Sequence, residues 1–96
     1  MSKVLLVGSG AREVAIARKI KESGQLVSLF CLSPSINPHI NLLCEKYFVA
    51  PLSDNQTVVS VAKKLAIDFA IIGPENPLEN GLVDAMEEEG FPCVCL

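Results

Sequence analysis

The sequence lacks several features that mark large classes of proteins. Its 96 residues include 8 Lys and Arg against 11 Asp and Glu, which gives a net charge of −3 without a basic run. Proteins that bind nucleic acid or other polyanions need a basic surface, so this class is disfavoured. No stretch reaches the roughly 20 apolar residues of a membrane span, and the N-terminus lacks the charged and apolar pattern of a signal sequence. We therefore expect a single cytoplasmic domain.

Patterns typical of metal sites and disulfide frameworks are also missing. His39 is the only histidine, and the four cysteines form no Cys-x-x-Cys pair. Such spacings favour reduced and mostly buried thiols over a zinc site or a set of disulfides. His39 follows a proline and has no cysteine or acidic residue close beside it, so we interpret it as a loop side chain rather than a ligand or a base. The cysteines are Cys31, Cys44, Cys93 and Cys95.

What the sequence does contain begins with its first dozen residues. Four consecutive apolar residues at 4–7 predict a strand that is buried on both faces, as in a parallel sheet covered by helices. Gly8 and Gly10 mark a sharp turn, and residues 11–22 carry apolar side chains at helical spacing. The chain therefore opens with a strand, a tight glycine turn and a helix.

This turn is a candidate anion site. The N–H groups of the first helical turn and the positive end of the helix dipole would lie just beyond the strand, where a phosphate could bind. The glycines could instead serve only to reverse the backbone. Arg12 and Glu13 favour anion binding, since neither residue is needed for packing at the start of a helix.

A dinucleotide-binding domain would share this opening but needs two further features. The third glycine of its fingerprint is absent, because Glu13 occupies that place, and Ser33 stands where an acidic residue would hold ribose hydroxyls. NAD and FAD are therefore disfavoured, and with them a Rossmann-type oxidoreductase. The sequence also offers no nucleophile–base pair, no metal cluster and no P-loop lysine, so we assign no catalytic residue.

Strands and helices alternate along the rest of the chain. Apolar runs predict four further strands, and helical spacing next to capping residues predicts two further helices after a Pro- and Asn-rich loop with one helical turn near 40–44. The expected strands cover 26–32, 47–50, 67–72 and 91–96, the helices follow 53–56 and 76–77, and the loop covers 33–45. This order predicts one Rossmann-like α/β domain over residues 1–96, with a five-stranded parallel sheet, strand order 3-2-1-4-5 and helices on both faces.

The predicted strand order brings a second loop beside the first. The first and fourth strands become neighbours, so the loops at 9–13 and 73–78 would border one crevice at the carboxyl edge of the sheet. Glu75 lies between two prolines in the second loop, and its carboxylate could accept hydrogen bonds from vicinal hydroxyls or pair with an amine. A ligand that places its phosphate on the first loop and its hydroxyls on the second would be a ribose phosphate. The alternative is that Glu75 is a solvated loop residue.

Two segments of the sequence resemble one enzyme family. Residues 4–13, VLLVGSGARE, are similar to the V-L-V-I-G-S/N-G-G-R-E of phosphoribosylamine–glycine ligase, also called glycinamide ribonucleotide synthetase, and residues 71–81 are similar to its V-x-G-P-E-x-P-L-x-x-G. The resemblance covers essentially the whole chain and implies the N-terminal, pre-ATP-grasp domain. This family makes glycinamide ribonucleotide from phosphoribosylamine, glycine and ATP in purine biosynthesis, through a glycyl phosphate that the amine attacks. ATP, magnesium and glycine belong mainly to later domains, so the resemblance implies no cofactor in this chain.

The resemblance also implies roles for individual residues. Gly10, Arg12 and Glu13 would lie near the sugar phosphate, and Glu75 would lie near the ribose or its amine. Together with the other residues of the two motifs, they give an expected substrate site of Gly8, Gly10, Arg12, Glu13, Gly73, Pro74 and Glu75.

The sequence departs from the family pattern at several positions. Val14 stands where the family has histidine, Ala11 replaces a glycine, and residues 32–37 match its A-P-G-N-x-G turn only loosely. We expect a chain without the ATP-grasp and C-terminal domains, a fragment or split subunit that is inactive without an ATP-grasp portion in cis or in trans. The alternative is a diverged, non-catalytic module that binds a sugar phosphate, another small anion or a partner protein. An uncovered apolar patch could also make the domain a homodimer.

Overall fold

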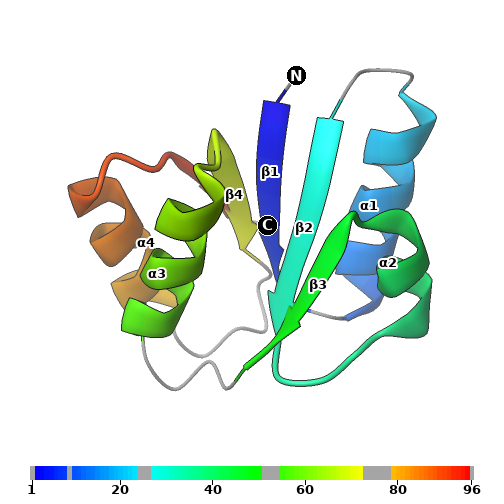
Figure 1. Ribbon diagram of the computed structural model, residues 1–96, viewed down its shortest axis with the longest axis horizontal. Coiled ribbons are helices and arrows are strands. Elements are labelled where there is room, and N and C mark those ends of the chain that lie inside the picture. Colours follow the sequence, from blue (N-terminus) through cyan, green and yellow to red (C-terminus); the bar gives the residue numbers. More distant parts are fainter. Residues whose placement is uncertain (1, 9, 24–26, 51–54, 73–78, 96) are drawn as a thin grey trace.

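The computed structural model describes residues 2–8, 10–23, 27–50, 55–72 and 79–95. Five parallel strands form one sheet in the order β3-β2-β1-β4-β5 (Figure 1). The strands are β1 (Ser2–Val7), β2 (Val27–Ser33), β3 (Lys46–Val49), β4 (Phe69–Ile72) and β5 (Cys93–Cys95). The predicted strand order is confirmed, and the first strand of the chain lies at the centre of the sheet.

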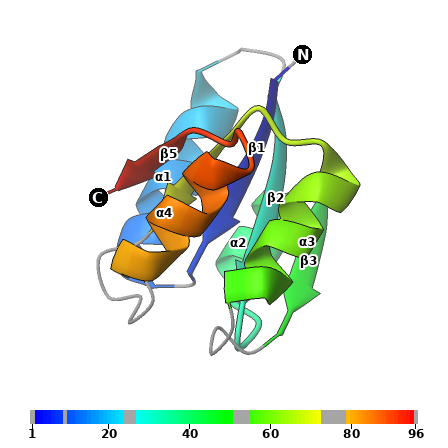
Figure 2. The ribbon, with the colours of Figure 1, turned by 90° about the vertical axis from the view of Figure 1, so that its left-hand side faces the viewer.

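Two pairs of helices cover opposite faces of this sheet. α1 (Ala11–Glu22) and α2 (Pro38–Leu43) lie on one face, and α3 (Asn55–Leu65) and α4 (Glu79–Glu88) lie on the other (Figure 1). Figure 2 looks onto α3 and α4, with the sheet behind them. Right-handed crossovers explain this division, because the chain runs outward from β1 to β3 and then reverses direction toward β4 and β5.

The short helix α2 begins earlier than the sequence predicts. Its first residue is Pro38 rather than Ile40, and the side chain of the N-cap residue Asn37 accepts a hydrogen bond from the backbone N–H of His39 at 3.0 Å. Proline suits the first turn of a helix, where its missing N–H has no helical partner to lose. His39 therefore lies in the first turn of a helix rather than in a loop, and its side chain is exposed.

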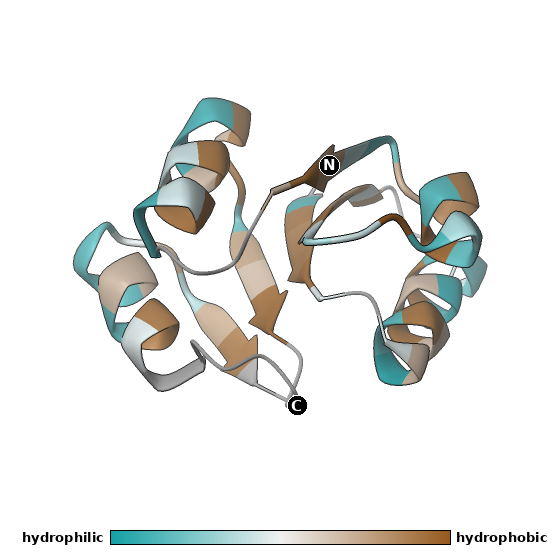
Figure 3. Ribbon diagram, turned by 90° about the horizontal axis from the view of Figure 1, so that it is seen from below, coloured by the Kyte–Doolittle hydropathy of each residue, from teal (hydrophilic) through white to brown (hydrophobic). Residues whose placement is uncertain are grey.

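β1 is buried on both faces, as its apolar run predicts. Leu5 and Val7 pack on the side of α3 and α4, whereas Val4 and Leu6 pack on the side of α1 and α2, and all four are at most 1% exposed. Side chains along a strand alternate between faces, so a strand covered on both sides has no position that favours a polar residue. Figure 3 shows mostly apolar strands between helices that carry most of the polar residues. No helix in the described part of the chain is long and apolar enough to cross a membrane.

The α1–α2 face of the sheet has an exposed apolar side chain on the edge strand β5. α1 and α2 lie on one face of the sheet, and α3 and α4 lie on the opposite face (Figure 1). Ile71 of β4 pairs in register with Val94 of β5, and Val94 is 50% exposed. Register partners share a face of the sheet, so Val94 lies on the same side as Ile71. We call the surface formed by the exposed Val94, the half-buried Phe69 and the edge of the buried Ile71 the open half-face.

Candidate functional site

The turn after β1 depends on glycine at position 8. Gly8 has a φ of +123°, a conformation that other residues rarely adopt, and its N–H donates a hydrogen bond to the carbonyl of Leu32 at 3.0 Å. A Cβ atom at Gly8 would collide with the carboxylate of Glu13, whose Cδ atom would lie 3.2 Å away. The backbone conformation and this close approach each require glycine, so the predicted tight glycine turn is confirmed at Gly8.

Gly10 is the N-cap residue of α1, with extended backbone angles of φ −81° and ψ −177°. Its carbonyl accepts a hydrogen bond from the N–H of Val14 at 3.1 Å. As a glycine it has no side chain that could cap the first turn, so the N–H groups at this end of α1 can serve an anion together with the helix dipole. Arg12 is exposed in the same turn, where its guanidinium can reach a phosphate from solvent.

Glu13 has a different environment from Arg12. Its side chain is 0% exposed and lies against Gly8, beneath the turn. The nearby thiol of Cys31 donates a hydrogen bond to the carbonyl of Gly8 at 3.4 Å, and burial raises the pKa of this thiol to about 12, so it stays neutral at physiological pH. We expected Glu13 and Arg12 to lie together near the sugar phosphate. The structure buries Glu13 beneath the turn and exposes Arg12 at its surface. The helix dipole favours an acidic residue in this first turn of α1.

The second predicted loop begins beside the first. Val7 at the end of β1 pairs in register with Ile72 at the end of β4, so the chain leaves both strands at the same point of the carboxyl edge. This is where the strand order reverses, and the predicted switch point is confirmed. The predicted site residues of this loop, Gly73, Pro74 and Glu75, lie outside the described residues.

A third loop, at residues 33–37, borders the same edge, and it contains none of the predicted site residues. It follows β2, whose Leu32 carbonyl accepts the hydrogen bond from Gly8. The loop is bonded to the hydroxyl of Tyr47, a residue of β3. The contacts of this hydroxyl are Ser33 Oγ at 2.6 Å, the Ser35 carbonyl at 2.6 Å and the Asn37 backbone nitrogen at 3.1 Å. Sequence spacing gave no sign of this cluster, since the contacts span 10 to 14 residues and depend on how β3 pairs with β2.

The described cysteines differ in burial. Cys31 is a buried free thiol and Cys44 a half-buried one, whereas the half-buried Cys93 directs its thiol at the carbonyl of Phe91 at 3.7 Å. Among the residues that the structure describes, no group of three or more His, Cys, Asp or Glu side chains could hold a metal ion. These residues therefore do not fit a magnesium site.

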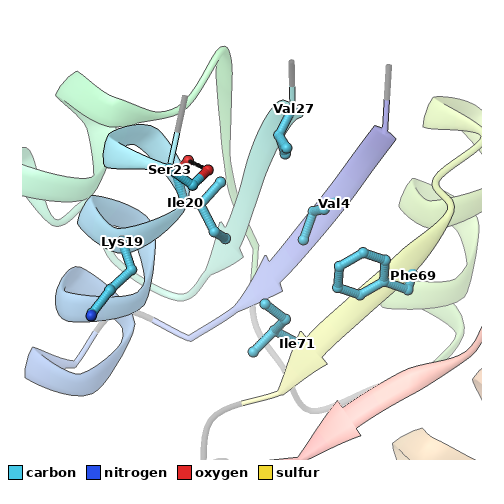
Figure 4. Close-up of a pocket in the computed structure, with 7 residues that line it drawn as sticks. All are labelled: Val4, Lys19, Ile20, Ser23, Val27, Phe69 and Ile71. Carbon is cyan, nitrogen blue, oxygen red and sulfur yellow. Dashed lines mark hydrogen bonds between the residues drawn. The ribbon is translucent and has the colours of Figure 1, made fainter. Parts of the chain in front are cut away.

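A hollow of about 290 Å³ lies at the opposite edge of the sheet (Figure 4). Figure 4 shows Ile20 of α1 and Phe69 of β4 on either side of Val4. The first residues of β2 and β4 line the hollow, so it opens at the amino edge of the parallel strands, away from the loops described above. It adjoins the open half-face, with which it shares two residues. Its lining residues are Val4, Lys19, Ile20, Ser23, Val27, Phe69 and Ile71.

The fold and the turn at the switch point define a class of domain. N5-carboxyaminoimidazole ribonucleotide synthetase from Thermotoga maritima superimposes on 97% of this chain and 24% of its own, with a TM-score of 0.77 and 17% sequence identity. At this identity the likeness concerns the fold alone. The chain has the Rossmann-like α/β fold of a pre-ATP-grasp domain.

The particular family follows from the sequence. The family model described as phosphoribosylglycinamide synthetase, N domain, matches residues 2–95, and the chain belongs to this family. Phosphoribosylamine–glycine ligase of Pyrococcus furiosus is 45% identical over 94 residues, which are 98% of this chain and 21% of that protein. The same enzyme of Methanopyrus kandleri is 45% identical over 93 residues, 96% of this chain and 21% of that protein. The predicted resemblance is confirmed, and the chain spans about a fifth of the length of these relatives.

Proposed function

We propose that this chain is the phosphoribosylamine-binding portion of an ATP-dependent phosphoribosylamine–glycine ligase of purine biosynthesis. It is a fragment or a split subunit that works with an ATP-grasp portion in cis or in trans. The proposal is carried by the match of the chain to the N-domain family. The glycine turn at the switch point and the exposed Arg12 on the first turn of α1 agree with it.

The proposed site divides the substrate between two loops. The N–H groups at the start of α1 and the guanidinium of Arg12 bind the phosphate, while Glu13 supports the turn from below. The loop with Gly73, Pro74 and Glu75 binds the ribose hydroxyls or the amine. The pairing of Val7 with Ile72 supports this division, because it starts both loops at the same point of the sheet.

This portion binds and orients its substrate in the proposal, and it has no catalytic residue of its own. In the family's reaction the amine of phosphoribosylamine attacks the carbonyl carbon of glycyl phosphate, the phosphate group leaves, and an amide bond forms. Holding the amine in one orientation lowers the entropy cost of that attack. ATP and magnesium are assigned to the ATP-grasp portion in this proposal.

A titration with ribose 5-phosphate, followed by amide signals in NMR spectra, tests the proposal. The signals of Gly10 to Glu13 and of Gly73 to Glu75 should shift, and inorganic phosphate should shift only the first set. Ribose without phosphate should bind much more weakly. If no signal in either loop moves at saturating ribose 5-phosphate, the proposal is wrong.

The alternative function is a non-catalytic module that binds a sugar phosphate, another small anion or a partner protein. It is motivated by Val14, which stands in place of the family's histidine and packs against the α1–α2 side of the core. Glu75→Ala separates the two functions. The change should weaken ribose 5-phosphate binding in the ligase portion, and it should leave the affinity for another partner unchanged in the module.

The proposed surroundings are cytoplasmic, with the ATP-grasp portion as partner and without nucleic acid or membrane. A homodimer formed through the open half-face is a second proposed assembly. The mass of the native polypeptide in its source cell distinguishes the arrangements in cis and in trans. A mass several times that of the 96-residue chain indicates the first domain of a complete ligase, whereas a mass near 10.3 kDa indicates a split subunit or a module.

A further inference from the structure

We propose that Tyr47 is a positioning residue of the phosphoribosyl site, because its hydroxyl holds residues 33–37 against the ligand crevice. The inference rests on the proposed function. Tyr47 comes from β3, two strands away from the switch point, and so acts on the site through the loop rather than by touching the substrate. The loop follows β2 directly and so lies on the β2 side of the turn after β1.

The Tyr47 hydroxyl lies in a cluster of polar groups from the loop, in which Ser33 Oγ also contacts the Ser35 carbonyl. A phenol has one proton to donate and two lone pairs that accept. The hydroxyl donates to the carbonyl of Ser35 at 2.6 Å and accepts from the backbone N–H of Asn37 at 3.1 Å. The hydroxyl of Ser33, 2.6 Å away, is its third partner. Burial raises the pKa of Tyr47, so the proton that is donated to the loop stays in place at neutral pH.

Strand pairing and the start of α2 hold the two ends of the loop, and Tyr47 bonds residues between them. Pro34, Ser35 and Ile36 are exposed, and Ile36 is 59% exposed despite its apolar side chain. Pro34 has no N–H to donate. Asn37 is the N-cap of α2, so the phenol ties the end of β2 to the start of the next helix. Loss of the hydroxyl would remove the side-chain link between Ser35 and Asn37, while Ser33 Oγ would still contact the Ser35 carbonyl.

The position of the loop connects this clamp to the ligand. The carbonyl of Leu32, immediately before the loop, accepts a hydrogen bond from the N–H of Gly8 at 3.0 Å. The loop therefore starts beside the turn that is proposed to hold the phosphate. A loop that samples several conformations must be ordered when the ligand binds, and this ordering weakens the affinity.

Tyr47→Phe tests the inference, because it removes only the hydroxyl. We expect the dissociation constant for ribose 5-phosphate, measured by titration calorimetry on the protein at its native length, to rise about tenfold. Ser33→Ala, which leaves two of the three bonds of the phenol, should raise it less. Hydrogen exchange of the Asn37 amide should become faster in Tyr47→Phe even without ligand.

A control variant separates positioning from general stability. Ile67→Val, in the core on the other side of the sheet, costs about 0.5–1.5 kcal/mol of stability, comparable with the loss of one hydrogen bond. It should leave the dissociation constant unchanged. If wild type binds and Tyr47→Phe binds equally well, or if Ile67→Val weakens binding as much, the inference about Tyr47 is wrong while the proposed function stands. If wild type itself does not bind ribose 5-phosphate, both are wrong.

Discussion

A side chain at position 8 would collide with Glu13, and replacing Gly8 by alanine tests how strongly this contact constrains the turn. The alanine must keep a φ of +123° or rebuild the turn, and strain of this kind costs about 1–3 kcal/mol. The new Cβ atom must also displace the buried carboxylate of Glu13, and overpacking costs about 1–3 kcal/mol more. The sum is roughly 2–6 kcal/mol, or a fall in melting temperature of at least about 10 °C for a domain of this size.

Gly90→Ala is the matched control for this change. Gly90 has a φ of +86° but no atom within 4 Å of an added Cβ, so only the conformational cost applies. In urea denaturation followed by circular dichroism, Gly8→Ala should lose about 1–3 kcal/mol more than Gly90→Ala, and Gly8→Val should lose more still. Combining Gly8→Ala with Glu13→Ala should give a coupling energy that recovers part of this difference. Equal losses in Gly8→Ala and Gly90→Ala would refute the idea that Glu13 constrains the turn.

Three further predictions concern binding, pH and assembly. Arg12→Ala should keep the melting temperature within a few degrees and weaken ribose 5-phosphate binding about 10- to 100-fold in calorimetry, whereas Arg18→Ala, exposed farther along α1, should bind like wild type. The pKa of Cys31 is raised from 9.0 to about 12 in the folded chain, so the unfolded chain loses this proton first and stability should fall from pH 9 upward. Urea denaturation at several pH values should show a slope of up to about 1.4 kcal/mol per pH unit that Cys31→Ala loses; an unchanged slope would contradict the assignment. Val94→Lys should abolish a homodimer formed through the open half-face in sedimentation experiments, and Leu42→Lys, at an 85% exposed position of α2, should not. Dimers that persist in Val94→Lys would place the contact elsewhere.

Much of the fold could be predicted because patterns of apolar residues in short segments indicate the strands and helices. The unbroken apolar run at 4–7 indicates a strand covered on both faces, and alternation of strands with helices then leaves few arrangements. The ends of elements were less certain. Phe91 and Pro92 precede β5 instead of opening it, because the N–H of Phe91 bonds to the carbonyl of Met86 at 2.9 Å and closes the end of α4.

The candidate site was less predictable because its side chains meet across the sheet. Gly8 could be identified from the turn alone, since a local conformation requires it. The burial of Glu13 depends on how α1 packs above β1, and the helical pattern says only that the residue lies in the first turn. Tyr47 reads as an ordinary strand residue until the register of β3 against β2 places its hydroxyl beside Ser33. Such contacts follow from strand pairing, which no short segment specifies.

The central position of β1 has a consequence for how the chain folds during synthesis. One edge of β1 pairs with β2, which follows soon after it, but the other edge pairs with β4, where Val4 is opposite Phe69. At about 5–20 residues per second, the ribosome needs roughly 2–8 s to make the segment between the end of β2 and the end of β4. During that interval the half made of β1, β2 and α1 can assemble, while the second edge of the most buried strand stays open to pairing with other chains. Insertions that delay the synthesis of β4 should therefore favour aggregation over correct pairing of β4 with β1.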